Sequence, residues 1–206
     1  MDLKKKEIHC IPTFTASKTT IGEQQIGSYG LYFGRVTEEK GVETVIKAYE
    51  KLPEYTVKIM GDDTTDEAKR LKKYVENHKM KNVEFLGFKS GAELENIIKG
   101  ARFTLIPSIW YDNLPNTALE SFQYSKPVIA SNIGSLPELV IDGENGYLFK
   151  PSNVEDLIKK IKMLDDDTLV KKMGQASRKR LESRFAPQTH YEDLMKIFNE
   201  AVKSRK

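Results

Sequence analysis

The chain has 206 residues, of which 39% are hydrophobic and 31% are charged, so it has the composition of a folded globular protein rather than a disordered one. Its 33 basic and 30 acidic residues are interspersed and leave a net charge of +3, which argues against nucleic acid as a partner. No apolar stretch approaches the ~20 residues that cross a bilayer, and no apolar run follows the charged N-terminus, so we expect a cytoplasmic protein.

The first 28 residues differ from the rest of the chain. The segment 8–12 has the apolar character of a strand, whereas 13–28 is polar, lacks periodicity and is expected to be an irregular, disordered arm. The single cysteine, Cys10, excludes an internal disulfide and is expected to be a buried small hydrophobe. We therefore divide the chain into a linker or arm, residues 1–28, and one domain, residues 29–206.

From residue 29 to residue 149, short β-branched or aromatic runs alternate with amphipathic segments, a pattern typical of a parallel sheet with crossover helices. Several strands are nearly continuous apolar runs, which indicates that helices cover both faces of the sheet. The sequence therefore predicts a Rossmann-like, three-layer α/β/α fold with a six-stranded parallel sheet. The predicted strands are Tyr29–Phe33, Thr56–Met60, Val83–Leu86, Phe103–Pro107, Pro127–Ser131 and Gly146–Phe149, and the helices between them are Gly41–Lys51, Thr65–His78, Ala92–Lys99 and Asn116–Tyr124.

The rest of the chain, residues 153–206, is predicted to be entirely helical, over Val154–Leu164, Asp166–Glu182 and Pro187–Val202. Basic side chains gather there, and two interpretations remain open: a solvated helical face, or a weak peripheral contact with an anionic membrane surface. The basic residues concerned are Lys171, Lys172, Arg178, Lys179, Arg180, Lys203, Arg205 and Lys206.

Ligands of open parallel sheets bind at the carboxyl ends of the strands, so the loops that follow strands are the place to look for a site. The first loop begins with Gly34, which lets the backbone approach a ligand closely. Arg35 and Lys40 supply positive charge suited to an anion such as a diphosphate, and Gly41 opens a helix whose N-terminus adds more. A tight turn with solvated charges would explain the same residues.

A second candidate segment runs from Asp112 to Glu120. Pro115 suits the first turn of a helix, Asn113 suits its capping region, and the free amides near Asn116 would form an anion site. Glu120 lies about two helical turns beyond Asp112, so two carboxylates would flank the amides, as the hydroxyls of a nucleoside diphosphate sugar require. Spacing alone is not specific, because a capping Asp and a solvent-facing Glu would also fit.

A third segment, Lys126–Val140, contains a buried strand, a small-residue loop and a helix start at Ser135 and Pro137, and turns are expected over 142–146. Together, the runs GRVTEEKG, DNLPNTALE, KPVIAS, GSLPELV and DGENGYLF resemble the retaining glycosyltransferases of family 4, over residues 29–149 and in the same order. These glycogen-synthase-like enzymes have two facing Rossmann-like domains, the GT-B architecture. The resemblance is to the C-terminal domain, which binds the sugar-nucleotide donor, here a UDP- or GDP-sugar.

The resemblance also implies roles for individual residues. Arg35 and Lys40 match the basic pair that neutralises the diphosphate without a metal, and Glu120 matches the glutamate that binds the ribose hydroxyls. Asp112 stands where the family usually has a glutamate near the sugar hydroxyls, so the donor sugar or its pose is expected to differ. The implied catalytic residues are Arg35, Lys40 and Asp112, and the implied donor-binding residues are these three with Gly34, Phe88, Lys89, Asn113, Leu114, Pro115, Asn116, Thr117 and Glu120.

By the same resemblance, the partner would be an N-terminal acceptor-binding domain, missing here or on a separate chain, and residues 5–12 would be the end of that domain. The reaction would transfer a hexose, with retention, to a glycan or lipid-linked acceptor, and this chain alone would have little or no activity. The terminal helix would cross to the other domain and here would expose Leu194, Ile197, Phe198 and Val202. A lipid-linked acceptor would place the protein at the inner face of the membrane.

Other interpretations stay open at this point. The chain could be a non-catalytic sugar-nucleotide-binding subunit that serves a separate partner, or a sugar-nucleotide epimerase with the same double-Rossmann architecture. A dinucleotide-dependent oxidoreductase fits less well, because the G-x-G-x-x-G fingerprint after the first strand is absent from the sequence. The three histidines, His9, His78 and His190, are expected to be structural or solvated rather than catalytic.

Overall fold

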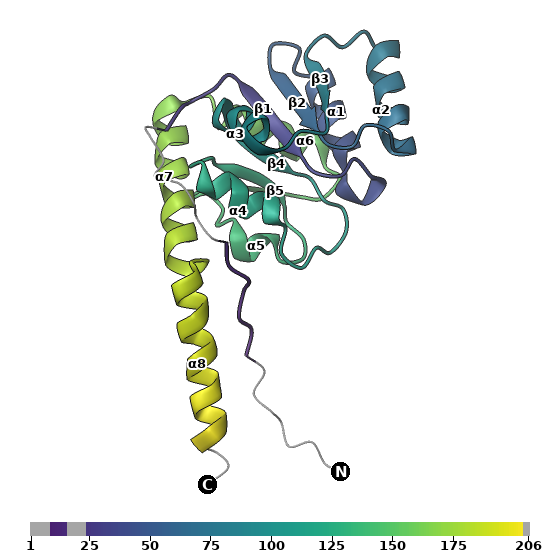
Figure 1. Cartoon of the computed structure of the whole chain (residues 1–206). Helices are drawn as coiled ribbons and strands as arrows, with labels where there is room; N and C mark the ends of the chain where they lie inside the picture. Colours follow the sequence, from purple (N-terminus) through teal and green to yellow (C-terminus); the bar gives the residue numbers. More distant parts are fainter. Residues whose placement is uncertain (1–8, 16–23, 204–206) are drawn as a thin grey trace.

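Six parallel strands form the sheet, in the order β3-β2-β1-β4-β5-β6, in a computed structural model that describes residues 9–15 and 24–203 (Figure 1). The predicted sheet is confirmed, and each strand lies within about two residues of its expected position. The strand order reverses between β1 and β4, the point at which open sheets of this kind bind ligands. The observed bounds are β1 (Tyr29–Phe33), β2 (Thr56–Met60), β3 (Val83–Gly87), β4 (Ala101–Ile106), β5 (Val128–Ser131) and β6 (Gly146–Phe149).

The helices also begin and end close to their predicted positions. Side-chain caps explain several of the starts: Thr65, Asn153 and Asp166 each accept a hydrogen bond from a backbone amide in the first turn that follows. The short 3-10 helix η1 (Glu38–Lys40), which precedes α1, was expected to be loop. The other helices are α1 (Val42–Glu50), α2 (Asp66–Asn77), α3 (Gly91–Lys99), α4 (Asn116–Gln123), α5 (Leu136–Leu139), α6 (Val154–Lys162), α7 (Asp167–Arg184) and α8 (Pro187–Lys203).

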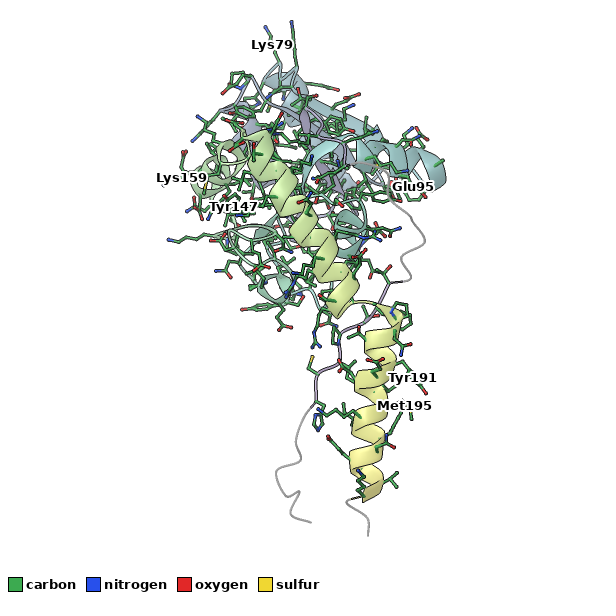
Figure 2. All side chains as sticks on the ribbon, turned by 90° about the vertical axis from the view of Figure 1, so that its left-hand side faces the viewer. Lys79, Glu95, Tyr147, Lys159, Tyr191 and Met195 are labelled. Carbon is green, nitrogen blue, oxygen red and sulfur yellow. The ribbon has the colours of Figure 1, made fainter. Side chains whose placement is uncertain are left out.

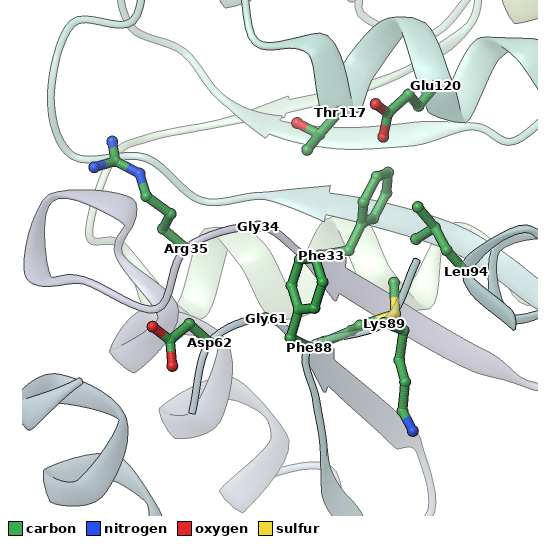
Figure 3. Close-up of a pocket in the computed structure, with 11 residues that line it drawn as sticks. Phe33, Gly34, Arg35, Gly61, Asp62, Phe88, Lys89, Leu94, Thr117 and Glu120 are labelled. Atoms are coloured by element: carbon green, nitrogen blue, oxygen red, sulfur yellow. The ribbon is translucent and has the colours of Figure 1, made fainter. Parts of the chain in front are cut away.

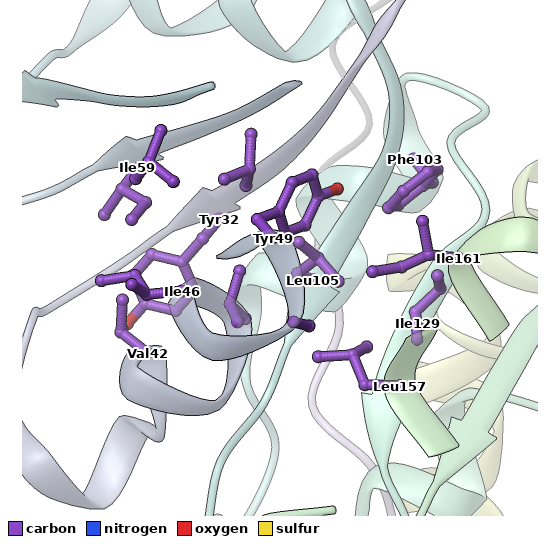
Figure 4. Close-up of a cluster of buried hydrophobic side chains, with 14 of the residues drawn as sticks. Tyr32, Val42, Ile46, Tyr49, Ile59, Phe103, Leu105, Ile129, Leu157 and Ile161 are labelled. Carbon is purple, nitrogen blue, oxygen red and sulfur yellow. The ribbon is translucent and has the colours of Figure 1, made fainter. Parts of the chain in front are cut away.

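Side chains alternate between two cores on opposite faces of the sheet, as the period of two in a strand requires. On one face, Tyr32, Ile59 and Leu105 pack under α1, α2 and α6, in the cluster drawn in Figure 4. On the other face, Leu31 and Ile106 pack under α3, α4 and α5. Coverage of both faces explains the nearly continuous apolar runs in the central strands.

The segment before β1 is fixed at the amino end of the sheet by a buried lysine. Lys126 is 1% exposed, and its Nζ donates to the carbonyl oxygens of Gln25 at 2.6 Å, Lys99 at 2.6 Å and Ala101 at 2.7 Å. Gln24 Nε2 donates to the Ser125 carbonyl at 2.8 Å. Residues 24–28 therefore pack on the domain, while residues 16–23 lie outside the described residues, so the expectation of disorder is not addressed there.

Two expectations for the N-terminal segment are wrong. Residues 9–15 form no strand, because they lie along α8 and α7 rather than at a sheet edge: Thr15 N–H donates to the Phe185 carbonyl at 3.1 Å, and the Pro12 carbonyl lies 2.9 Å from His190 Nδ1. Cys10 is exposed rather than buried, since no core reaches this segment. Residue 8 lies outside the described part.

Helix α8 projects away from the sheet and its covering helices (Figures 1 and 2). Not one of its residues is buried, and Phe198 and Val202 are 54% and 64% exposed, as expected for an apolar stripe without a covering partner. Among the described residues, we find no helix with both the length and the hydrophobicity that a membrane span requires. The basic cluster of α7 and α8 is described except for Arg205 and Lys206.

Candidate functional site

The loop that follows β1 begins with Gly34, whose backbone contacts the end of β2. Gly34 has φ +148°, and its N–H donates to the Met60 carbonyl at 2.9 Å. A Cβ built on Gly61 would lie only 1.9 Å from the Gly34 carbonyl oxygen. Glycine is therefore required at Gly61, because a side chain there would clash with the Gly34 backbone, and it is favoured at Gly34 by the φ value.

Tyr32 and Arg35 shape the start of this loop. The Tyr32 side chain is buried and its hydroxyl donates to the Arg35 carbonyl oxygen. Burial, with the nearby charge of Asp112, raises the pKa of Tyr32, so its hydroxyl stays a neutral donor. The Arg35 guanidinium is 71% exposed, and its salt-bridge partner Glu39 lies 3.8 Å away. A weak, exposed pair of this kind leaves the guanidinium available to an anionic ligand.

Lys40 and Asp112, which are 72 positions apart in sequence, form a close ion pair. Lys40 Nζ lies 2.7 Å and 2.8 Å from the two carboxylate oxygens of Asp112, and Ser108 Oγ donates to the same carboxylate at 2.8 Å. The two charged side chains are only 19% and 24% exposed. Both carboxylate oxygens are therefore already engaged, and a ligand would have to share Lys40 and Asp112 with this pair.

The N-terminus of helix α4 lies beside the Lys40–Asp112 pair. The helix begins at Asn116, as predicted, and Pro115 is its N-cap. No side chain caps the helix, so the expectation that Asn113 would cap it is wrong. Pro115 holds extended backbone dihedrals that direct the chain into the first turn. The amides of Asn116 and Thr117 have no partner within the helix, because the first turn of any helix lacks acceptors for them, and they can therefore receive an anion.

Two cavities lie side by side along this edge of the sheet. The larger has a volume of about 520 Å³ and the smaller about 200 Å³. They share a wall made by Phe33, Gly34, Arg35 and Thr117. The larger cavity is also lined by Met60, Gly61, Asp62, Phe88, Lys89, Leu94 and Glu120, and the smaller one by Tyr32, Lys40, Leu105, Ile106, Ser108, Asp112, Pro115 and Asn116.

The larger cavity combines apolar walls with one half-buried carboxylate. Figure 3 shows Thr117 and Glu120 on α4 facing Phe33 and Phe88 across it. Thr117 and Glu120 are three positions apart, so they lie on the same side of α4. Desolvation by burial raises the pKa of Glu120 above its ordinary value. A carboxylate placed in this way is suited to accept hydrogen bonds from paired hydroxyls of a ligand.

Ten of the twelve residues predicted for the site line these two cavities. The other two do not: Asn113 is exposed, and Leu114 packs against the core beneath α4 and α5. The apolar walls Phe33 and Met60 on strands and Leu94 on α3 are not distinguished by the sequence, because apolar residues that line a cavity have the same pattern as core residues. Ser108, in the loop that follows β4, also lines the smaller cavity, although a serine there carries no distinguishing signal in the sequence.

No metal site is evident in the described part of the chain. Among those residues, no group of three or more His, Cys, Asp or Glu side chains is placed to hold a metal ion. The site instead offers cations and helix amides for a polyanion. It also offers two partly buried carboxylates, those of Asp112 and Glu120, for hydroxyl groups, while the third carboxylate of the lining, that of Asp62, is exposed.

Comparison with known proteins identifies relatives of this chain. It is 30% identical over 174 residues to an uncharacterized glycosyltransferase of Methanocaldococcus jannaschii, covering 84% of this chain and 48% of that protein. It is also 31% identical over 186 residues to the glycogen synthase of Mycobacterium tuberculosis, covering 85% of this chain and 42% of that enzyme. The chain therefore spans about half the length of the curated relatives it matches.

Solved structures show the same fold. The crystal structure of Anabaena HepE in complex with UDP superposes with a TM-score of 0.76 at 23% identity, covering 84% of this chain and 49% of that one. The family model described as glycosyl transferases group 1 matches residues 20–180, which include both cavities. On these grounds, the chain belongs to the glycosyl transferases group 1 family.

Proposed function

We propose that this chain is the donor-binding, C-terminal half of a retaining glycosyltransferase of family 4. The observation that carries the proposal is the pair of adjoining cavities, with Arg35 on the shared wall, Glu120 in the larger cavity and the pair Lys40–Asp112 in the smaller one. A nucleoside diphosphate sugar has the matching order of groups: a flat base and ribose, a diphosphate, and a polyhydroxyl ring.

In this assignment the larger cavity takes the nucleoside. Phe33, Met60 and Leu94 supply apolar surface for the base, Phe88 and Lys89 lie beside it, and Glu120 accepts hydrogen bonds from the ribose hydroxyls. The diphosphate lies at the shared wall, where Arg35 and the amides of α4 converge. The smaller cavity takes a hexose, whose hydroxyls reach Asp112.

The same residues would assist departure of the nucleoside diphosphate. The bond between the anomeric carbon and the diphosphate oxygen breaks, and the acceptor oxygen bonds to that carbon on the same face. The proton of the acceptor hydroxyl leaves with the diphosphate. Negative charge develops on the leaving group, so Arg35, Lys40 and the α4 amides stabilise it, and no metal is needed for that purpose. Lys40 would exchange its contact with the Asp112 carboxylate for one with the diphosphate, and its ammonium group would have an anionic partner in both states.

The acceptor would be a glycan or a lipid-linked glycan held by an N-terminal domain that faces this edge of the sheet. Residues 1–28 would then belong to the linker between the two domains, and α8 would contact the other domain through its exposed stripe. We expect this chain alone to bind donor and to transfer little or no sugar. A non-catalytic subunit that supplies a donor site to a separate partner chain remains the alternative.

The donor site can be tested by calorimetry with UDP, GDP, UDP-glucose and GDP-mannose in the presence of EDTA. We expect one nucleoside series to bind, and Arg35→Ala and Glu120→Ala each to weaken that binding by about 1–3 kcal/mol, the usual effect of removing a charge-assisted hydrogen bond. Lys47→Ala is a matched control, because Lys47 pairs with Glu43 on α1 and lines neither cavity.

Two outcomes would count against the assignment. Equal loss of affinity in Lys47→Ala and Arg35→Ala would mean that only net charge matters. Absence of binding by all four nucleotides to a folded sample would contradict the donor site in this chain. To separate the transferase from the non-catalytic alternative, the same variants would be assayed for transfer together with the remaining half of the protein.

Donor affinity should also depend on pH through Glu120. Because burial raises the pKa of Glu120, its carboxylate takes up a proton at a higher pH than an exposed glutamate does. Protonation removes acceptor capacity for the ribose hydroxyls, so affinity falls as the pH is lowered through this raised pKa. The contribution of Glu120 to folding stability has the opposite pH dependence and increases as the pH is lowered. The folded chain binds the proton more tightly than the unfolded chain does, so protonation of Glu120 favours the folded state.

Glu120→Gln provides the control for this pH dependence. Phosphate groups of the nucleotide titrate near pH 6 themselves, so the comparison must be between proteins at each pH. We expect the affinity difference between the natural chain and Glu120→Gln to shrink as the pH is lowered from about 7.5 to about 4, which includes the ordinary titration range of a glutamate and the region above it. A difference that stays constant over this range would show that the Glu120 carboxylate does not contact the nucleotide.

A further inference from the structure

A loop with exposed aromatic side chains connects two wall residues of the smaller cavity. Ser108 and Asp112 both line that cavity, and Ile109, Trp110 and Tyr111 join them. These three side chains are 36%, 67% and 73% exposed. Three consecutive large apolar side chains facing solvent at the edge of a binding site indicate a surface that contacts a ligand or partner.

The backbone of this loop is held in place on several sides. Ile109 N–H donates to the Glu39 carbonyl at 3.0 Å, and Ser135 Oγ donates to the Asp112 carbonyl at 2.9 Å. Gly134, with φ +60°, lies so close that a Cβ there would be 3.4 Å from Tyr111 Cα. The rings are therefore presented by a braced turn, and their exposure is not the result of an unsupported loop.

The charges around the loop disfavour polyanionic ligands such as a lipid bilayer or a nucleic acid. From residue 103 to residue 149 the only basic residue is Lys126, and it is buried with its Nζ on backbone carbonyls. The acidic residues of the same stretch include Asp112, Glu120 and Glu138. Close to the loop in space, Lys40 is paired with Asp112 and Arg35 with Glu39, so these basic side chains already have acidic partners. The loop therefore lacks the cluster of unpaired basic side chains that an anionic lipid bilayer or a nucleic acid needs near its phosphates.

We propose that Trp110 and Tyr111 form a stacking platform for a pyranose ring of a carbohydrate acceptor. A neutral sugar has an apolar face of C–H groups that packs on an aromatic ring, and its hydroxyls can donate to nearby carboxylates. The inference rests on the proposed function, because it places the acceptor next to the donor sugar at Asp112. An acceptor hydroxyl must reach the anomeric carbon from this side, and the platform would hold the ring that carries it.

The platform can be tested directly, because Trp110 is the only tryptophan of the chain and its fluorescence therefore reports on this loop alone. Maltotriose, cellotriose and chitotriose would be titrated into the 206-residue chain at millimolar concentration, with and without UDP or GDP. We expect at least one trisaccharide to give a saturable blue shift of the Trp110 emission. Tyr111→Ala should weaken that response at least about fivefold.

Tyr191→Ala is the matched control, since Tyr191 is a similarly exposed tyrosine, 57% exposed, on α8. It should leave the sugar response unchanged, and Tyr111→Ala should leave nucleotide affinity unchanged in calorimetry. The proposal is overturned if no trisaccharide changes the Trp110 emission, or if vesicles of phosphatidylglycerol shift it while the sugars do not. Sugar binding without nucleotide binding would contradict the proposed donor site but support the aromatic platform. Failure of the donor site can therefore be distinguished from failure of the platform.

Discussion

Replacement of Lys126 by methionine is expected to lower the free energy of unfolding by about 3–4 kcal/mol, one of the largest effects available in this chain. Methionine keeps the length and apolar stem of the side chain but removes the ammonium group. Three carbonyl oxygens, those of Gln25, Lys99 and Ala101, would lose their common donor. The bond to Ala101 is buried and the bonds to Gln25 and Lys99 are partly buried. The loss outweighs the relief from burying a charge, because an unsatisfied buried carbonyl costs about 1–3 kcal/mol.

Burial lowers the pKa of Lys126 to about 8, so at neutral pH the group is still protonated and donates with all three of its N–H bonds. Denaturant unfolding at about pH 7 is the measurement, with Lys159→Met as the control for an exposed lysine. The control should change stability by less than about 0.5 kcal/mol. If Lys126→Met were as stable as the natural chain, the hydrogen bonds to the three carbonyls would not be holding this segment.

Gly61→Ala should abolish or strongly weaken donor binding, by more than about tenfold, and lower stability by about 1–3 kcal/mol. The new Cβ would lie 1.9 Å from the Gly34 carbonyl oxygen and 3.4 Å from Val36. The first of these contacts is with backbone, so the loop that carries Arg35 must move away from β2. Such a shift displaces the shared wall of the two cavities, on which both the nucleoside and the diphosphate would depend.

A glycine far from the site provides the comparison. Gly143 has φ +81° and open space around the position of a Cβ, so Gly143→Ala introduces backbone strain of about 1–2 kcal/mol without a clash. Calorimetry with the preferred nucleotide should find donor affinity unchanged in Gly143→Ala and lost in Gly61→Ala. Equal donor affinities in the two variants would mean that the contact between Gly34 and Gly61 does not position the loop.

The sheet was predictable from the sequence because each strand is a short apolar run bounded by polar turns. The run YGLYF, for example, could not be solvated on either face, and it became the central strand β1. The period of two in a β-strand then placed Tyr32 and Leu31 on opposite cores. The loops after strands marked the functional edge, since in a parallel sheet all carboxyl ends meet on one side.

Other features depend on tertiary contacts that no local pattern reveals. The distance between Lys40 and Asp112 follows from the neighbouring positions of β1 and β4 in the sheet, which bring residues 72 positions apart into contact. Lys126 looked like an ordinary lysine before a strand, and its burial becomes visible only when the carbonyls of Lys99 and Ala101 are placed around it. Asn113 is a good capping residue by type, but the chain enters α4 through Pro115.

Helix α8 and the rest of the domain need not unfold together. Its 17 residues have no buried side chain, and an isolated helix of this length is only marginally stable in water. Local unfolding of α8 would therefore cost much less free energy than unfolding of the sheet with its two cores. The helical tail can lose and regain order while the cavities stay intact, and any surface that covers Phe198 and Val202 would draw this local equilibrium toward the helix.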